Sequence, residues 1–536
     1  MAENNPKPSE PIKPEPAPET VWTIMVYLAG DNNLADECVF ALTQIKEVDT
    51  DKRVRVVAQF DPTGRRVRTR RFTINKALKD GTLQNKALPQ APQFQGWKNR
   101  GKIIEDTLEG NNPLPEGTVR FSDDAPPARQ VVKPNDVVDG DSGDPKFLFD
   151  FISWSVENFP ADHYMVVLSG HGGGVTEQEF LFDQTSKGTL TIAELGRVFK
   201  RIHGEGGLKN KKGEPLQIDI VGMDSCLMSM AEIAYELRDS VKYMISSESF
   251  GPRSGWPYGR MIERLNKSLD AGQSTPEDLG LITIDEHVDF YTEYAVTDGL
   301  SVDIAMMDLE RADELTNAIH TLAEVLIGEL KVGKSRKDRQ LPSDFLDQIV
   351  LAHWEAQSYN GEVYVDLRDF CECLTRRYNP RDITPVPDTD PKADEVKDRI
   401  KRRTAVQAAC EQTVNAIAAL VKKSCYMGVD FQYSFGVSIY FPWAEVDPDY
   451  NDTQLSFVAA SGWKNFLEAY VDITRRPPRN FEPGQLEVIG LDRVRKTPTD
   501  QRGPSNLLIR SMRNPPIDVV EKGLSDCTKD RLGLNE

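Results

Sequence analysis

Long apolar runs are missing from this sequence. No stretch of about 20 apolar residues occurs, so we expect no transmembrane helix. Residues 1–20 are rich in Pro and Glu and have almost no apolar content. This composition predicts a disordered tail, and it lacks the apolar core of a secretory signal. From these absences we expect a cytoplasmic protein.

Positive charge is scarce relative to negative charge. The chain has 65 Lys and Arg residues against 84 Asp and Glu residues, which gives a net charge of −19. An acidic surface argues against nucleic acids and anionic membranes as partners, because both carry negative charge themselves. It is compatible with basic peptides as substrates.

Cysteines are few and irregularly placed. Seven occur in the 536 residues, and an odd number without regular spacing does not suggest a disulfide framework. Cys371 and Cys373 are too close together for the usual zinc spacing, so no metal site is predicted there. A reduced setting is the simpler interpretation, and it agrees with the cytoplasmic expectation.

A strand, a short turn and a helix are predicted over residues 216–237. A β-branched apolar run ends at Val221, and apolar residues recur at helical spacing from Leu227. Cys226 then lies between the carboxyl end of a strand and the amino end of a helix, a position that binds ligands and favours a thiolate. Cys226 is therefore a candidate nucleophile. The alternative is a small buried apolar residue.

A second apolar strand is predicted over residues 164–168, and it ends in Ser-Gly-His followed by three glycines. His171 could act as a general base toward a thiol and as a general acid toward a leaving amine. Gly172 has no Cβ to block a substrate carbonyl from its backbone N–H. If the two strands are neighbours in a parallel sheet, His171 and Cys226 lie close together. The alternatives are a capping or core histidine and a plain flexible glycine loop.

The chain is 39 % apolar, long enough for one large or two medium domains. Strands and helices alternate over residues 21–330, which predicts an α/β domain with a mainly parallel sheet flanked by helices. Within it, residues 76–144 are polar and aperiodic and indicate an insertion. Residues 331–475 predict a mainly helical C-terminal subdomain. Residues 476–536 are polar and Pro-rich and indicate a loosely ordered extension.

Three shorter segments carry local predictions. The arginine-rich run 65–74 predicts an exposed hairpin with a solvated, charged edge. Residues 392–423 predict a helix. Residues 205–214, EGGLKNKKGE, predict a basic flexible loop.

Two motifs together resemble a known family. GHGG after one strand and MDSC after the next are similar to motifs of the clostripain family of cysteine peptidases, relatives of the caspases. The opening TIMVYLAGDNNLA is similar to the first strand and loop of that family. Weaker similarities follow in the family's order: FLFDQTSKGTLTIAEL, ISSESFGPRSGWPY, EVYVDLRDF and FGVSIYFPW. The resemblance covers most of residues 21–445 and implies a caspase-like fold.

The expected chemistry is attack of the Cys226 thiolate on a peptide carbonyl, with His171 moving the protons. The backbone N–H groups of Gly172 and Cys226 would hold the oxyanion, and each such donor is typically worth about 3–4 kcal/mol. The sequence shows no third member of a triad, and the resemblance implies that a dyad suffices. The chemistry needs no cofactor; calcium is implied by the resemblance alone.

The resemblance also implies a specificity pocket. An acidic residue at the position of Asp224 helps the family to bind Arg or Lys at the cleaved bond, and a carboxylate is a natural partner for a cation. The alternative role of Asp224 is a helix N-cap. The family's phrase Gly-Trp-Asp-Tyr reads Gly-Trp-Pro-Tyr here, so Pro257 cannot supply the second acid. This departure weakens the prediction of basic specificity.

The sequence therefore predicts a cysteine endopeptidase that acts on proteins or peptides after Arg or Lys. A catalytically silent caspase-like binding scaffold is the alternative, and an amidase-like thiol enzyme is a third. The oligomeric state is left open.

The segment between the two motifs predicts a self-processing site, because we expect it to begin and end near the cleft and exposed loops are readily nicked. Lys187 is the preferred position, ahead of the cluster Lys209, Lys211 and Lys212. The alternative is an inert surface insertion.

Overall fold

The computed structural model describes residues 20–48, 53–62, 69–74, 140–176, 179–252, 254–273, 275–295, 301–335, 344–443, 445–451 and 454–475. The predicted extension 476–536 lies outside these residues. So do the predicted tail, apart from residue 20, and the predicted insertion, apart from residues 140–144.

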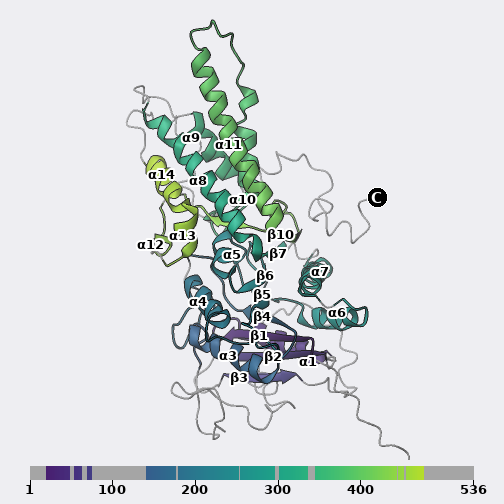
Figure 1. Cartoon of the computed structure of the whole chain (residues 1–536). Coiled ribbons are helices and arrows are strands. Elements are labelled where there is room, and N and C mark those ends of the chain that lie inside the picture. Colours follow the sequence, from purple (N-terminus) through teal and green to yellow (C-terminus); the bar gives the residue numbers. More distant parts are fainter. Residues whose placement is uncertain are drawn as a thin grey trace, which may run out of the picture.

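An eight-stranded sheet organises the chain (Figure 1). The strands are β1 (Trp22–Gly30), β2 (Val54–Pro62), β3 (Arg70–Ile74), β4 (His163–Ser169), β5 (Ile218–Asp224), β6 (Val241–Ser246), β7 (Val302–Asp308) and β10 (Val421–Met427), in the order β10-β7-β6-β5-β4-β1-β2-β3. Strands β2, β1, β4, β5 and β6 run parallel, whereas β3, β7 and β10 are antiparallel to their neighbours. The predicted mainly parallel sheet is confirmed.

Helices cover both faces of the sheet (Figure 1). One face carries α3 (Pro145–Asn158), α4 (Ile192–His203) and α5 (Ala231–Leu237), and the other carries α1 (Ala35–Glu47), α6 (Tyr258–Asp270) and α7 (Pro276–Ala295). All nine residues of β1 are buried. A parallel strand covered on both faces must be apolar nearly throughout, which explains the continuous apolar runs in the sequence.

Local signals fix where two of these helices begin. The side chain of Asp144 accepts the Lys146 N–H at 2.8 Å, and Pro145 occupies the first position of α3. Thr191 and Glu194 form a capping box at the start of α4, in which each side chain binds the other residue's backbone N–H. Both helices are thereby positioned to pack behind β4 and its neighbours.

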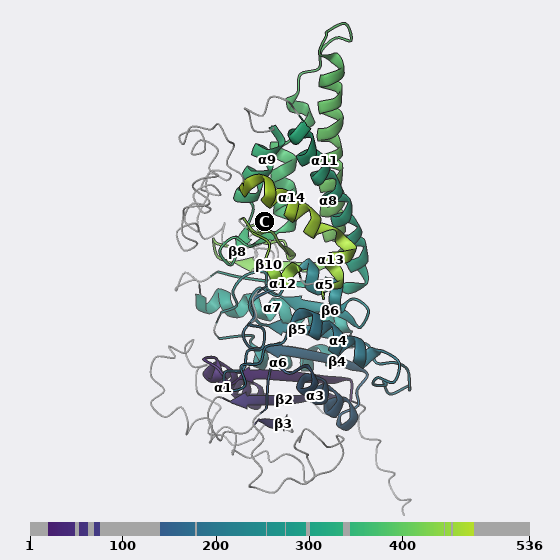
Figure 2. The ribbon, with the colours of Figure 1, turned by 90° about the vertical axis from the view of Figure 1, so that its left-hand side faces the viewer.

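A mainly helical part stands beyond the β10 end of the sheet, as Figures 1 and 2 show for α8, α9 and α11. Its helices are α8 (Ala312–Ser335), α9 (Asp344–Glu355), α10 (Leu367–Arg377), α11 (Ala393–Leu420), α12 (Pro448–Asn451), α13 (Ser456–Ser461) and α14 (Trp463–Arg475), with single turns η1 (Leu309–Arg311) and η2 (Pro380–Asp382). A small antiparallel sheet joins β11 (Ser438–Tyr440), β9 (Tyr364–Asp366) and β8 (Ser358–Tyr359).

The helix predicted over residues 392–423 is too long at its end. α11 stops at Leu420, and the next residues form β10, which pairs antiparallel with β7. Pairing with β7, a strand more than 110 positions earlier in the chain, outweighs the local helical propensity of these residues. Moreover, α8 packs against α11 and α14. The chain on either side of residue 330 therefore contributes to both the sheet and the helical part.

The arginine-rich edge is only partly solvated. β3 is an edge strand, as predicted, but Arg71 on it is buried. Its Nε donates to Gln59 Oε1 at 2.7 Å, and its guanidinium lies over the rings of Phe151 and Trp154. The prediction of an exposed hairpin is wrong at this residue, because an arginine stem and a flat cation can cover apolar surface.

Two absences bear on the earlier expectations. No helix in the described ranges is both long enough and apolar enough to cross a bilayer. Among the described cysteines, Cys38, Cys226, Cys371, Cys373 and Cys410 form no disulfide. Cys425 on β10 is disulfide-bonded, which departs from the reduced state expected of the cysteines.

Candidate active site

Two neighbouring strands deliver the predicted histidine and cysteine to one edge of the sheet. β4 and β5 are parallel partners, and Ser169 pairs with Asp224 at their carboxyl ends. His171 and Cys226 each lie two residues beyond these ends and line the same cavity, of about 270 Å³. The expected neighbourhood of the two strands is confirmed.

The backbone of Gly172 lies directly against that of Cys226. A Cβ at Gly172 would come within 2.3 Å of the Cys226 carbonyl oxygen and 2.8 Å of its nitrogen. Both contacts are shorter than any side chain tolerates, so only glycine fits without moving the backbone. The close approach brings the N–H-bearing segments of the two residues together at the cavity.

The helix predicted from Leu227 begins four residues later. Leu227 itself has φ +64°, in the left-handed region that few non-glycine residues occupy, and α5 starts at Ala231. Cys226 is therefore not at a helix amino terminus, and the macrodipole effect falls off within one turn. The prediction that a helix terminus favours the thiolate is wrong.

The thiol has a different local environment. Burial raises the pKa of the Cys226 thiol, and the backbone N–H of Gly251, 3.3 Å from Sγ, lowers it in part. A thiolate at this position depends on such hydrogen bonding rather than on a helix dipole.

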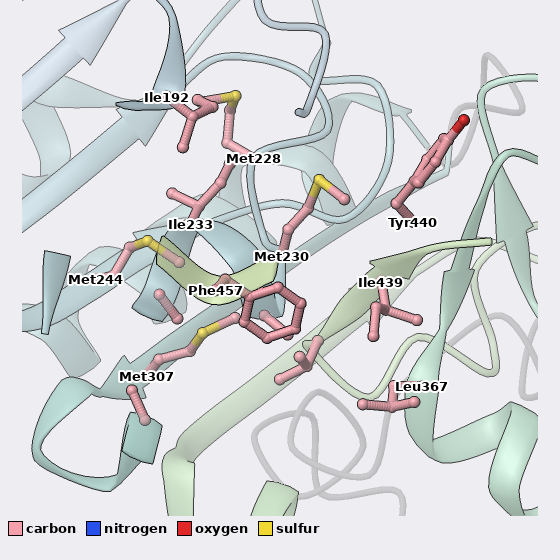
Figure 3. Packing of buried hydrophobic residues seen from close by; sticks show 14 of the residues in the cluster. Ile192, Met228, Met230, Ile233, Met244, Met307, Leu367, Ile439, Tyr440 and Phe457 are labelled. Carbon is pink, nitrogen blue, oxygen red and sulfur yellow. The ribbon is translucent and has the colours of Figure 1, made fainter. Parts of the chain in front are cut away.

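The segment after Cys226 packs against the hydrophobic core. Met228 and Met230 are fully buried, and Figure 3 shows them in the same cluster as Met244 and Met307. On the other side, the Leu227 N–H donates to the Ser249 carbonyl at 3.0 Å. These contacts restrict the backbone that carries Sγ.

His171 is oriented by a residue that the sequence did not single out. Its Nε2 lies 2.6 Å from Oδ1 of Asn33 in the turn after β1. With Oδ1 as the acceptor, Nε2 carries the proton and Nδ1 is left for proton transfer. The strand order could have pointed to Asn33, because β1 is the other neighbour of β4 and its carboxyl end lies at the same edge of the sheet.

Asp224 lies at the same cavity and is already hydrogen-bonded. It accepts bonds from the Ser169 hydroxyl at 3.2 Å, the Tyr258 hydroxyl at 2.8 Å and the Trp256 N–H. Burial raises the pKa of Asp224, and these bonds oppose that rise. The alternative of an N-cap is wrong, because α5 begins seven residues further along.

Negative charge dominates the cavity. Three carboxylates line it, from Glu37, Glu179 and Asp224, and none of its described lining residues is Lys or Arg. Phe250, 54 % exposed, also lines it and is the single exposed large apolar side chain in the described ranges. The sequence reasoning missed Glu37 and Glu179, because neither belongs to a recognisable motif.

Lys187 lies on an exposed turn that hydrogen bonds to Asp183 hold in place. Its backbone N–H donates to the Asp183 carbonyl at 3.0 Å, and its φ is +65°. Asp183 is fully buried and also accepts the Ser186 N–H at 2.8 Å. The turn belongs to the segment that leaves the carboxyl end of β4, on the edge of the sheet where His171 lies.

The lysine cluster 209–212 lies at the opposite edge of the sheet. Its loop connects α4 to the amino end of β5. Lys211 Nζ binds Asp162 Oδ1 at 3.2 Å and the Thr20 carbonyl at 2.9 Å, and both partners precede the amino ends of strands. The expectation that the whole inter-motif segment begins and ends near the cleft is therefore wrong, because parallel strands enter and leave at opposite edges.

The carboxylates of the described residues form no cluster that could hold a metal ion such as calcium. Calcium takes six to eight oxygen ligands from carboxylates, carbonyl groups and water. Within the described ranges, no group of three or more His, Cys, Asp or Glu side chains is placed to hold a metal ion. No catalytic step is therefore assigned to calcium.

Comparison with known proteins agrees with the two motifs. The model of the family described as Clostripain family matches residues 26–469. Clostripain of Hathewaya histolytica is 22 % identical over 393 residues, which span 67 % of this chain and 66 % of clostripain, just under two thirds of its length.

Two solved structures are also similar, each covering 83 % of this chain and 99 % of its own. One is a secreted C11 cysteine protease from Bacteroides thetaiotaomicron in complex with an irreversible peptide inhibitor, at 14 % identity and a TM-score of 0.49. The other is an inactive zymogen C11 protease from Parabacteroides distasonis, at 16 % identity and a TM-score of 0.48. The family match extends over more than half of the sequence, and this chain belongs to the clostripain family.

Proposed function

We propose that this chain is a cysteine endopeptidase that uses Cys226 and His171 as its catalytic dyad. The observation that carries the proposal is the convergence of these two residues on one cavity from the ends of neighbouring parallel strands. A nucleophile, a base and a residue that orients the base are the parts that covalent catalysis requires. Cys226, His171 and Asn33 supply them.

In the first half of the reaction, His171 takes the proton of the Cys226 thiol, and Sγ attacks the peptide carbonyl carbon. The oxyanion that forms is held by the backbone N–H groups of Gly172 and Cys226. The imidazolium then gives its proton to the leaving nitrogen, the C–N bond breaks, and the new amino terminus departs. An acyl-enzyme thioester remains on Sγ.

In the second half, His171 removes a proton from water, and the resulting hydroxide attacks the thioester carbonyl. The same N–H groups hold the second oxyanion. When the C–S bond breaks, the carboxylic acid product leaves and the proton held by His171 returns to Sγ. Neither half needs a cofactor, because the thiol and the imidazole supply the nucleophile and the base.

Substrate preference follows from the charge of the cavity. Asp224 and the other lining carboxylates favour a cation, so we propose that cleavage follows Arg or Lys. Self-processing after Lys187 is part of the same proposal, because Lys187 is exposed and belongs to the segment that follows His171.

Replacing either member of the dyad tests the proposal. Cys226→Ala and His171→Ala should each lower kcat on a peptide with Arg at P1 by at least about 10³-fold, because nucleophile and base act as a unit. The measurement is steady-state hydrolysis of a fluorogenic peptide panel with Arg, Lys, Asp and Leu at P1.

The matched control is His163→Ala. His163 begins β4 at the opposite end of the same strand, where its ring nitrogen binds Asp219, and its loss should leave kcat nearly unchanged. Near wild-type turnover in either dyad variant would refute the assignment. A strong preference for Asp at P1 would refute basic specificity but leave the dyad standing.

A further inference from the structure

The first turn of α1 presents a carboxylate to the cavity that contains Cys226. Glu37 lines this cavity and is 8 % exposed. Leu34, Cys38 and Ala41 line it too, and spacings of three and four place all four residues on one side of the helix. Glu37 is the charged member of an otherwise apolar group.

Asp224, the other buried acid of the cavity, has little hydrogen-bonding capacity left. A carboxylate offers about four acceptor positions. Ser169, Tyr258 and the Trp256 backbone already occupy three of them. A P1 guanidinium brings five N–H donors and an ammonium brings three, and buried charged donors left without partners are costly. A buried cation therefore needs a second acceptor.

Neither of the other candidates fits that role as well as Glu37. Pro257 precedes α6 and carries no charge. Glu179 is exposed, so water already solvates its charge, whereas Glu37 is buried.

Glu37 and Asp224 have a common neighbour, Cys38, in the cavity lining. Burial raises the pKa of the Cys38 thiol most, and the charges of Glu37 and then Asp224 raise it further. Glu37, Cys38 and Asp224 all line the cavity, so both carboxylates belong to its wall.

We propose that Glu37 is a specificity-determining residue that pairs, beside Asp224, with the cationic end of the P1 side chain. The inference rests on the proposed peptidase function and adds a residue outside its motifs. The apolar side chains of Leu34, Cys38 and Ala41 pack against the methylene stem. A planar guanidinium fork can bridge two carboxylates better than a compact ammonium, so Arg is preferred to Lys.

The test compares Glu37→Gln with wild type on one peptide that carries Arg or its neutral isostere citrulline at P1. Loss of a charge-assisted hydrogen bond should lower kcat/KM for Arg by about 10–100-fold, mainly through KM, and for citrulline by less than about 3-fold. The matched control is Asp36→Asn, which removes one negative charge from the same helical turn at a residue that does not line the cavity. It should change kcat/KM for the Arg and the citrulline peptide by less than about 2-fold.

Glu37→Asp keeps the charge and should retain more Arg turnover than Glu37→Gln. Thermal unfolding and the rate at which iodoacetamide alkylates Cys226 report on fold and thiol in each variant. Equal losses for Arg and citrulline, unchanged Arg cleavage in Glu37→Gln, or the reverse order of the two variants would overturn the inference. A wild type that cleaves only after neutral or acidic residues would instead overturn the proposed basic specificity, and one that cleaves no peptide would overturn the peptidase function.

Discussion

At the scale of single residues, the candidate site depends on short contacts between segments far apart in the chain. Asn33 follows β1 and His171 follows β4, yet Nε2 and Oδ1 lie 2.6 Å apart. A hydrogen bond of this length fixes the ring and its tautomer. Asn33 is therefore a positioning residue for His171 within the proposed dyad.

Asn33→Ala should lower kcat by about 10–100-fold and change KM by less than about 2-fold, because the ring loses its orientation while the cavity keeps its lining. Asn33→Asp should restore much of kcat, since a carboxylate also accepts the Nε2 proton. It should also move the acidic limb of the kcat/KM profile to higher pH, because a negative neighbour favours the imidazolium. The measurement is the pH profile of both variants between pH 5 and 9.

A purely structural role for Asn33 predicts something different. In that case both variants lose activity in step with their thermal stability, and the acidic limb stays where it is in wild type. Unchanged kcat in Asn33→Ala would remove Asn33 from the mechanism.

At the scale of secondary structure, α5 connects the segment after Cys226 to the helical part. Glu232 on α5 is fully buried, and its Oε1 accepts the Tyr440 N–H at 3.0 Å and the Tyr450 hydroxyl at 3.2 Å. Tyr440 belongs to β11 and Tyr450 to α12, more than 200 positions later. One carboxyl group therefore joins three elements.

Stability should depend on the ionisation of this group. Burial raises the pKa of Glu232 to about 7, above its value in the unfolded chain. The native state then holds a proton that the unfolded state has released, so the free energy of unfolding falls as pH rises from about 4.5 to about 7. The upper limit of this loss is about 3 kcal/mol, at 1.36 kcal/mol per unit of pKa.

Glu232→Gln removes this ionisation and keeps the Oε1 acceptor. The difference in unfolding free energy between the variant and wild type should therefore shift in favour of the variant by about 1–3 kcal/mol between pH 4.5 and pH 7.5. Urea unfolding at both pH values measures it, with Glu236→Gln on the same helix as the control. A difference that is the same at both pH values would contradict this account.

At the scale of the whole molecule, the direction of the strands decides which lysines can reach the chain's own cleft. The segment with Lys187 follows the carboxyl end of β4, where His171 lies, whereas Lys211 is bound to residues at the amino ends of strands. Self-processing within one molecule therefore favours Lys187 over the cluster at 209–212. Because the turn with Lys187 is hydrogen-bonded to buried Asp183, it must unfold locally before it can be cut.

Incubation of purified wild type should yield two fragments separated after Lys187, as measured by intact mass, and Cys226→Ala should stay whole. Lys187→Ala should block this cut, and the triple replacement of Lys209, Lys211 and Lys212 by Ala should not. Equal fragmentation of Cys226→Ala would point to a contaminating protease. A wild-type chain that stays whole while it cleaves peptides would show that processing is not required.

The sequence alone determined the order of strands and helices around the site. Buried parallel strands need near-continuous apolar runs, and the turns that end them need Gly, Ser, Asp or Asn. These are local requirements, so the strand ends at His171 and Cys226 could be located without coordinates. The neighbouring placement of β4 and β5 was a condition in the sequence analysis, and the strand order meets it, as consecutive strands often do.

Only the tertiary structure decided the rest, because the deciding contacts join distant segments. Leu227 has a backbone conformation in the left-handed region, and its N–H is hydrogen-bonded to the Ser249 carbonyl. The residues between it and the start of α5 include Met228 and Met230, which are buried in the core. β10 exists as a strand because β7 offers an edge to pair with. Asn33 and Glu37 reach the site only because β1 lies beside β4 and α1 covers that face of the sheet. Local propensity and residue spacing do not specify which distant segments meet. These features therefore depend on tertiary packing and pairing.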